Sequence, residues 1–100
     1  MPRRVVIVDD KLPMAETLAD GLADRGYEAR ALGSGRDALA MLAETDVLVT
    51  DLRMPEIDGL SLLERAHAIA PDVPVIVMTA YGAIDSAVES IRKGAFHYLT

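Results

Sequence analysis

Three aspartates that directly follow apolar segments are the residues of this chain best suited to chemistry. Segment 5–8 (Val-Val-Ile-Val) runs into Asp9 and Asp10, and segment 47–50 (Val-Leu-Val-Thr) runs into Asp51. Buried parallel strands read as continuous apolar runs, and ligands bind outside the carboxyl ends of such strands. We therefore predict that the three carboxylates meet at one edge of a parallel sheet.

A hydroxyl follows a third apolar segment in the same way, because segment 75–78 (Val-Ile-Val-Met) ends at Thr79. Carboxylates that lie together repel one another, and a divalent cation removes the conflict. Oxygen ligands favour a hard ion such as Mg²⁺, and the loops after these segments lack the His and Cys that zinc prefers. A carboxylate beside Mg²⁺ can attack phosphorus, and Thr79 can donate its hydroxyl to a phosphoryl oxygen.

Alternating strand and helix patterns predict the elements that position these groups. Strands are expected at 4–9, 27–32, 46–50, 75–79 and 96–99, and helices with their caps at 13–25, 34–43, 58–70 and 84–93. This order predicts an α/β fold with a parallel sheet, right-handed crossovers and helices on both faces. No helix follows the last strand, so we expect one domain, 1–100, truncated before its last helix.

Apolar periodicity predicts which face of each helix is buried. The predicted buried residues of the first and second helices are Met14, Ala15, Leu18, Ala19 and Leu22, and then Ala38, Leu39, Met41 and Leu42. Those of the third and fourth helices are Leu60, Leu63, Ala66 and Ile69, and then Ile84, Ala87, Val88 and Ile91.

Composition excludes several classes of protein. Half of the residues (51%) are hydrophobic, so one domain can form a core, and the absence of cysteine excludes disulfides and thiolate metal sites. A net charge of −6 with scattered Lys and Arg argues against direct nucleic-acid binding by this segment. No apolar run approaches the ~18 residues of a membrane span, and the start of the chain lacks the apolar region of a signal peptide. We therefore expect a cytoplasmic location.

The chain resembles the receiver domain of bacterial two-component response regulators. The matching segments are Val8-Asp9-Asp10, Asp51-Leu52-Arg53-Met54-Pro55-Glu56-Ile57-Asp58-Gly59, Met78-Thr79-Ala80-Tyr81-Gly82 and Gly94-Ala95-Phe96-His97-Tyr98-Leu99. They span the whole chain in the expected order. Among receivers, the chain is similar to the nitrogen-regulatory (sigma-54 activator) class in Thr-Ala-Tyr-Gly at 79–82 and Lys-Gly-Ala-Phe at 93–96.

The resemblance implies a flavodoxin-like, doubly wound, five-stranded sheet with strand order 2-1-3-4-5. It also implies that Asp51 accepts a phosphoryl group from the histidine of a sensor kinase. Asp9, Asp10 and Asp51 would hold Mg²⁺ together with the backbone carbonyl of Arg53.

Two further residues would transmit the phosphoryl signal. Thr79 would be the switch hydroxyl and Tyr98 the switch aromatic, and together they would alter the surface of helix 84–93 and the last strand. The family also places a lysine three residues after that aromatic, just beyond Thr100. The resemblance further implies an effector domain outside this chain, of the AAA+ sigma-54 activator kind that controls transcription. Apolar residues on helix 84–93 would favour docking to this effector or a homodimer that forms on phosphorylation.

Two alternatives to a phosphorylatable switch stay open. The first is an interaction module of receiver fold that never carries phosphate, which the absent lysine permits. The second is a Mg²⁺-dependent phosphohydrolase with an Asp nucleophile. Haloacid-dehalogenase-type enzymes of this kind need a second acid two residues after the nucleophile, where this chain has Arg53.

Overall fold

The computed structural model of the chain describes residues 3–51, 54–78 and 97–99. The elements are β1 (Arg4–Val8), α1 (Leu12–Asp24), β2 (Glu28–Leu32), α2 (Gly35–Ala40), the short 3₁₀ helix η1 (Leu42–Glu44), β3 (Val47–Asp51), α3 (Gly59–Ile69), β4 (Val75–Met78) and β5 (His97–Leu99). The predicted helix at 84–93 lies outside the described residues. None of the described helices is long and apolar enough to cross a membrane.

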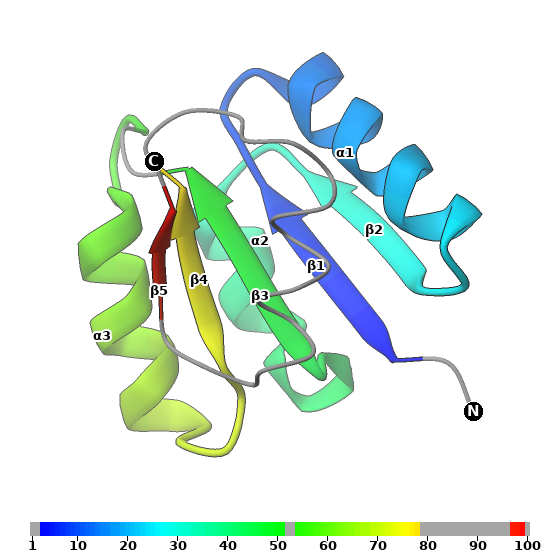
Figure 1. Cartoon of the computed structure of the whole chain (residues 1–100). Helices are drawn as coiled ribbons and strands as arrows, with labels where there is room; N and C mark the ends of the chain where they lie inside the picture. Colours follow the sequence, from blue (N-terminus) through cyan, green and yellow to red (C-terminus); the bar gives the residue numbers. More distant parts are fainter. Residues whose placement is uncertain (1–2, 52–53, 79–96, 100) are drawn as a thin grey trace.

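All five strands pair in parallel, in the order β2-β1-β3-β4-β5 (Figure 1). This confirms the predicted strand order, with β2 at one edge. Strands β1 and β3 are neighbours, and their register sets Val8 beside Thr50. The carboxyl ends of β1 and β3 therefore lie together, because paired parallel strands run in the same direction.

Successive side chains of each strand face opposite layers, and the core is split accordingly. On one face, Val5 and Ile7 pack with α1 residues such as Leu22. On the other face, Val6 packs with residues of α2, η1 and α3, Leu62 among them. Helix α1 thus covers one side of the sheet, and α2 and α3 cover the other (Figure 1).

Local sequence signals explain where the helices begin and end. Pro13 occupies the first turn of α1, and Gly26 follows its end with a φ of 91°. The side-chain oxygens of Ser34 and Asp58 accept backbone N–H groups in the first turns of α2 and α3, at 3.2 and 2.8 Å. Both predicted helix caps are therefore present.

The predicted buried face of α3 was partly wrong. Ala66 is buried, but Leu60 and Ile69 are 42% and 63% exposed, and Leu62 is fully buried instead. The predicted residues are spaced by three, and each such step falls about 60° short of a full helical turn. Four of them therefore spread over about half of the helix surface and cannot all face the sheet.

Three other expectations also differ in detail from the structure. Met14 of α1 is 42% exposed, although the rest of its predicted stripe is buried. Helix α2 ends at Ala40, and η1 replaces its last predicted turn. Thr45 donates its hydroxyl to the carbonyl oxygen of Met41 at 2.7 Å, which satisfies a backbone group at this break. Strand β3 includes Asp51, so the predicted nucleophile belongs to the strand itself.

Candidate functional site

The carboxyl end of β1 holds the first two predicted site residues. Asp9 is 1% exposed, and its backbone N–H donates to the carbonyl oxygen of Leu32 at 3.1 Å. The backbone N–H of Lys11 donates to Oδ1 of Asp9 at 2.8 Å, which fixes this buried carboxylate. Asp10 is exposed. One aspartate is therefore held by the fold while its neighbour remains open to solvent.

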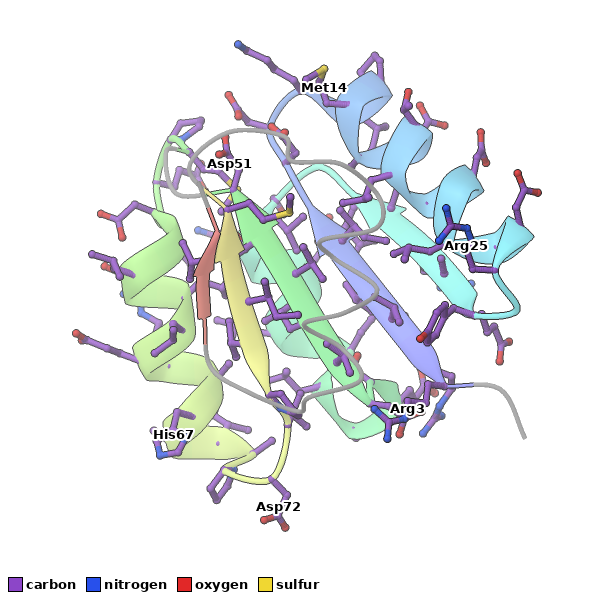
Figure 2. The ribbon with its side chains drawn as sticks, viewed as in Figure 1. Arg3, Met14, Arg25, Asp51, His67 and Asp72 are labelled. Carbon is purple, nitrogen blue, oxygen red and sulfur yellow. The ribbon has the colours of Figure 1, made fainter. Side chains whose placement is uncertain are left out.

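Asp51 is the last residue of β3 and is half-buried at the same edge of the sheet (Figure 2). One carboxylate oxygen from each of Asp9, Asp10 and Asp51 can be chosen so that all three lie within 4.8 Å of one another. We call these three residues the carboxylate cluster. The structure therefore brings together the three carboxylates that the sequence predicted to meet.

The backbone after Asp51 is held by contacts that the sequence reasoning did not foresee. Thr50 is fully buried, and its hydroxyl donates to the Asp51 carbonyl at 3.0 Å and lies 3.8 Å from the Met54 sulfur. Glu56 has a φ of 67°, and Ile57 donates its N–H to the Pro55 carbonyl at 2.8 Å. The loop thus contains a tight γ-turn with positive φ, a conformation that is rare and strained.

A cavity of about 180 Å³ adjoins the cluster. It lies between the loop that precedes α2 and the loop that follows β3, and Asp10, Arg36, Met54 and Glu56 are among its lining residues. Nη2 of Arg36, in the first turn of α2, and Oε2 of Glu56, in the loop after β3, are 3.7 Å apart. Asp10 of the carboxylate cluster therefore lines a small cavity whose lining also includes both members of an ion pair.

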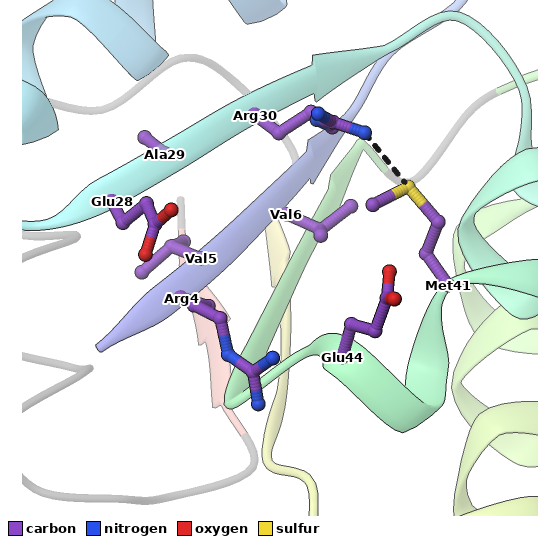
Figure 3. A pocket seen from close by; sticks show the side chains of 8 residues that line it. All are labelled: Arg4, Val5, Val6, Glu28, Ala29, Arg30, Met41 and Glu44. Carbon is purple, nitrogen blue, oxygen red and sulfur yellow. Dashed lines mark hydrogen bonds between the residues drawn. The ribbon is translucent and has the colours of Figure 1, made fainter. Parts of the chain in front are cut away.

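A larger cavity of about 320 Å³ lies at the opposite end of the strands (Figure 3). It is lined by Arg4, Glu28, Arg30, Met41 and Glu44, above the side chain of Val6. We place the site at the cluster despite the smaller cavity there, because ligands of parallel α/β sheets bind at the carboxyl ends of the strands.

Two carboxyl groups outside the cluster have pKa values below their ordinary range. The pKa of Asp58 is lowered because its side chain accepts the backbone N–H of Ser61, which favours the ionised form. The pKa of Asp46 is lowered chiefly by the backbone N–H of Arg4, which Asp46 accepts at 2.8 Å. Both shifts belong to structural contacts, at the start of α3 and the start of β1.

The cluster offers a set of ligands that could hold a metal ion. Its donors are carboxylate oxygens, and Asp10 and Asp51 are accessible to solvent. Mg²⁺ fits such a site because it binds through few carboxylates and keeps several of its waters. Asp51, on the central strand, could then serve as a nucleophile.

Three predicted site residues are described in part or not at all. Thr79 and Arg53 lie outside the described residues. Tyr98 lies in β5, where its backbone pairs with Val77 of β4, and its side chain is outside the description. Their predicted roles stay predictions.

The strand order and the acidic carboxyl edge define a flavodoxin-like α/β domain with an aspartate site. More narrowly, the chain belongs to the response regulator receiver domain family, whose model matches residues 5–100. The family resemblance predicted from the sequence is therefore confirmed.

Individual proteins support this assignment. The chain is 40% identical over 98 residues to the regulatory protein AtoC of Escherichia coli (strain K12), an alignment that covers 96% of this chain and 21% of that protein. It is 41% identical over 102 residues to the DNA-binding transcriptional regulator NtrC of Salmonella typhimurium. That alignment covers 99% of this chain and 22% of NtrC. These matches agree with the predicted likeness to the nitrogen-regulatory class. The chain spans about a fifth of the length of these curated relatives.

A solved structure also resembles this fold. The crystal structure of a response regulator receiver domain protein from Clostridium thermocellum superposes with a TM-score of 0.77 at 29% identity. The superposition covers 97% of this chain and 80% of that one. The parallel sheet described above is thus the receiver architecture.

Sequence reasoning missed three residues that shape the site, namely Thr50, Arg36 and Glu56. A threonine within a buried apolar segment was a usable signal, because a buried hydroxyl needs a hydrogen-bond partner. No feature of the sequence predicted the positive φ of Glu56, because positive φ is uncommon for residues other than glycine. The pairing of Arg36 with Glu56 depends on α2 and a loop that is distant from it in the sequence, which meet only in the folded chain.

Proposed function

We propose that this chain is a phosphorylatable signalling switch that receives its phosphoryl group from a sensor histidine kinase on Asp51. The observation that carries the proposal is the carboxylate cluster, whose oxygens approach within 4.8 Å at the carboxyl edge of a receiver-type sheet. Membership of the receiver family supports the same function.

The chemistry follows from a carboxylate that faces a phosphoryl donor. A side-chain oxygen of Asp51 attacks phosphorus in line with the phosphorus–nitrogen bond of the kinase phosphohistidine. That bond breaks, its electron pair returns to the imidazole ring, and Asp51 becomes an acyl phosphate. Water later hydrolyses the acyl phosphate and restores the carboxylate. The chain therefore acts on itself and turns over no separate substrate.

Asp9, Asp10, Asp51 and the backbone carbonyl of Arg53 would hold Mg²⁺. When bound, Mg²⁺ neutralises the charge that gathers on the phosphoryl oxygens. Within the chain, the Lys11 N–H keeps the Asp9 carboxylate oriented toward the cluster. The exposure of Asp10 leaves an approach for the cation from solvent.

The phosphoryl group would be sensed by Thr79 and Tyr98. Thr79 donates its hydroxyl to a phosphoryl oxygen, and the ring of Tyr98 turns inward into the space that Thr79 leaves. Such a local change biases a two-state element by differential stabilisation, typically ~1–3 kcal/mol. The element is the surface of helix 84–93 and β5, through which the switch would form a homodimer and control its effector.

The effector would be a transcription-regulating domain beyond this chain, of the AAA+ sigma-54 activator kind. The likeness to NtrC supports this assignment, because that relative is a DNA-binding transcriptional regulator. We place the switch in the cytoplasm, where it would meet the phosphohistidine of its kinase.

Intact mass after incubation with acetyl phosphate tests the proposal. We expect a phosphoryl adduct that requires Mg²⁺ and is absent from Asp51→Asn. The exposed Asp20→Asn on α1 is the matched control and should keep the adduct. If no adduct forms, the same test is made on a chain extended past Thr100 through the expected lysine.

Either alternative function would give a different result. Failure of the extended chain to form an adduct would overturn the proposal in favour of a phosphate-independent interaction module. Sustained turnover of a chromogenic phosphate ester would instead indicate a phosphohydrolase.

A further inference from the structure

The γ-turn centred on Glu56 is a strained stretch of backbone in the loop before α3. Glu56 is the one non-glycine residue with positive φ among them. Such a conformation is unfavourable by itself and persists only where the surroundings hold it. The turn therefore needs contacts elsewhere in the fold to keep it in place.

The first turn of α2 supplies these contacts through two consecutive residues. Gly35 is buried against Ile57, and a Cβ built on Gly35 would lie 3.4 Å from the Cβ of Ile57. Arg36, the next residue, pairs with Glu56 at 3.7 Å. One contact is apolar and the other is ionic, and they hold adjacent residues of the γ-turn.

The same turn belongs to the loop that starts at the nucleophile. In this loop, the sulfur of Met54 contacts the hydroxyl of Thr50, the residue before Asp51. Asp10, Arg36 and Glu56 line one cavity. A shift of the γ-turn therefore acts on two described features, the contact of Met54 with Thr50 and the cavity wall that includes Asp10.

The ion pair also affects the charge of the cavity lining. Arg36 is the basic residue of a cavity whose lining also carries Asp10 and Glu56. The pair places the Glu56 carboxylate 3.7 Å from the Arg36 guanidinium on α2, so one acidic charge of the cavity lining has a basic partner.

We infer that Arg36 is a positioning residue for the cation site: through Glu56 it holds the strained turn after Asp51 in the arrangement that binds Mg²⁺. This inference rests on the proposed function, because it concerns the Mg²⁺ site of the switch. Arg36 touches neither the cation nor the phosphoryl group in this scheme.

Two physical effects of removing Arg36 have opposite signs, and this makes the inference testable. Loss of a positive charge near an acidic site, taken alone, tightens cation binding through the electrostatic field. Loss of the contact that keeps the γ-turn in place, by contrast, weakens cation binding. The pair is largely exposed, with side chains 79% and 69% accessible, so the effect is modest. We expect Arg36→Gln to weaken Mg²⁺ binding by about two- to fivefold.

The experiment is an NMR titration of this chain with Mg²⁺, with no phosphoryl donor present. The Lys11 amide reports on the cluster, because it donates to the carboxylate of Asp9. The Ile57 amide reports on the γ-turn, because it donates to the Pro55 carbonyl. Arg36→Gln should shift the Ile57 amide before any Mg²⁺ is added and should raise the Kd for Mg²⁺.

Two further variants complete the test. The double exchange Arg36→Glu with Glu56→Arg keeps the net charge and should restore both readouts. Arg65→Gln, at an exposed position on α3, makes the same change in net charge and should leave the Ile57 amide in place.

Two negative outcomes are distinguishable. Unchanged or tighter Mg²⁺ binding by Arg36→Gln, while the wild-type chain binds normally, overturns the inference alone. A wild-type chain whose Lys11 amide does not respond to Mg²⁺ overturns the cation site itself and the inference with it.

Discussion

Replacing Asp10 with asparagine removes one negative charge from the carboxylate cluster without removing a buried side chain, since Asp10 is exposed. We expect this variant to be more stable than the wild-type chain in the absence of Mg²⁺. The reason is repulsion among three carboxylates whose nearest oxygens lie within 4.8 Å of one another.

The size of the effect follows from the distance and the exposure. Two unit charges about 4 Å apart repel by ~1 kcal/mol in water and by ~4 kcal/mol near a protein surface of low dielectric constant. Because Asp10 is exposed, the lower figure applies to each of its two neighbours in the cluster, and we expect stabilisation of about 1–2 kcal/mol. For a domain of this size, each kcal/mol raises the Tm by roughly 4–8 °C.

The assay is thermal unfolding followed by circular dichroism at low ionic strength, first with a chelator and then with Mg²⁺. Asp20→Asn, which makes the same charge change on an exposed face of α1, is the matched control. Mg²⁺ at a hundred times its Kd should stabilise the wild-type chain by ~2.7 kcal/mol. The Asp10→Asn variant should gain less, so its advantage in melting temperature over the wild-type chain should shrink.

Two results would refute this reasoning. If Asp10→Asn melts no higher than Asp20→Asn in chelator, repulsion within the cluster is too weak to matter. If Mg²⁺ stabilises Asp10→Asn as much as wild type, Asp10 does not contribute to the cation site.

Two further predictions concern α3. Leu62→Ala should cost about 2–5 kcal/mol in urea unfolding because Leu62 is fully buried, while Leu60→Ala should cost less than ~0.5 kcal/mol; equal costs would contradict the observed packing. Asp58→Ala should lower the Tm at neutral pH through loss of the helix cap. Because the folded pKa of Asp58 is lowered, its stabilisation is present above the ordinary carboxyl pKa of about 4 and is lost as pH falls through the lowered value. A Tm difference that persists unchanged in acid would contradict this cause.

The sequence pattern determined the strands and the meeting of the three aspartates, and the family resemblance supplied the order of the strands in the sheet. Residues 5–8 and 47–49 are apolar, as strands buried on both faces must be, and an aspartate follows each strand pattern at Asp9 and Asp51. The parallel α/β topology then leaves the carboxyl ends of β1 and β3 side by side. The starts of α2 and α3 could also be predicted from the sequence, because the caps at Ser34 and Asp58 involve residues only three positions apart.

Only the tertiary structure decided how the site is held. The choice of Leu62 over Leu60 as the buried residue of α3 depends on how that helix is rotated against the sheet. The positive φ of Glu56 contradicts local preference and is compatible with the fold because Gly35 and Arg36 hold the turn from another segment. Periodicity and capping are properties of neighbouring residues, whereas strain and loop pairing are set by contacts between segments that are distant in the sequence.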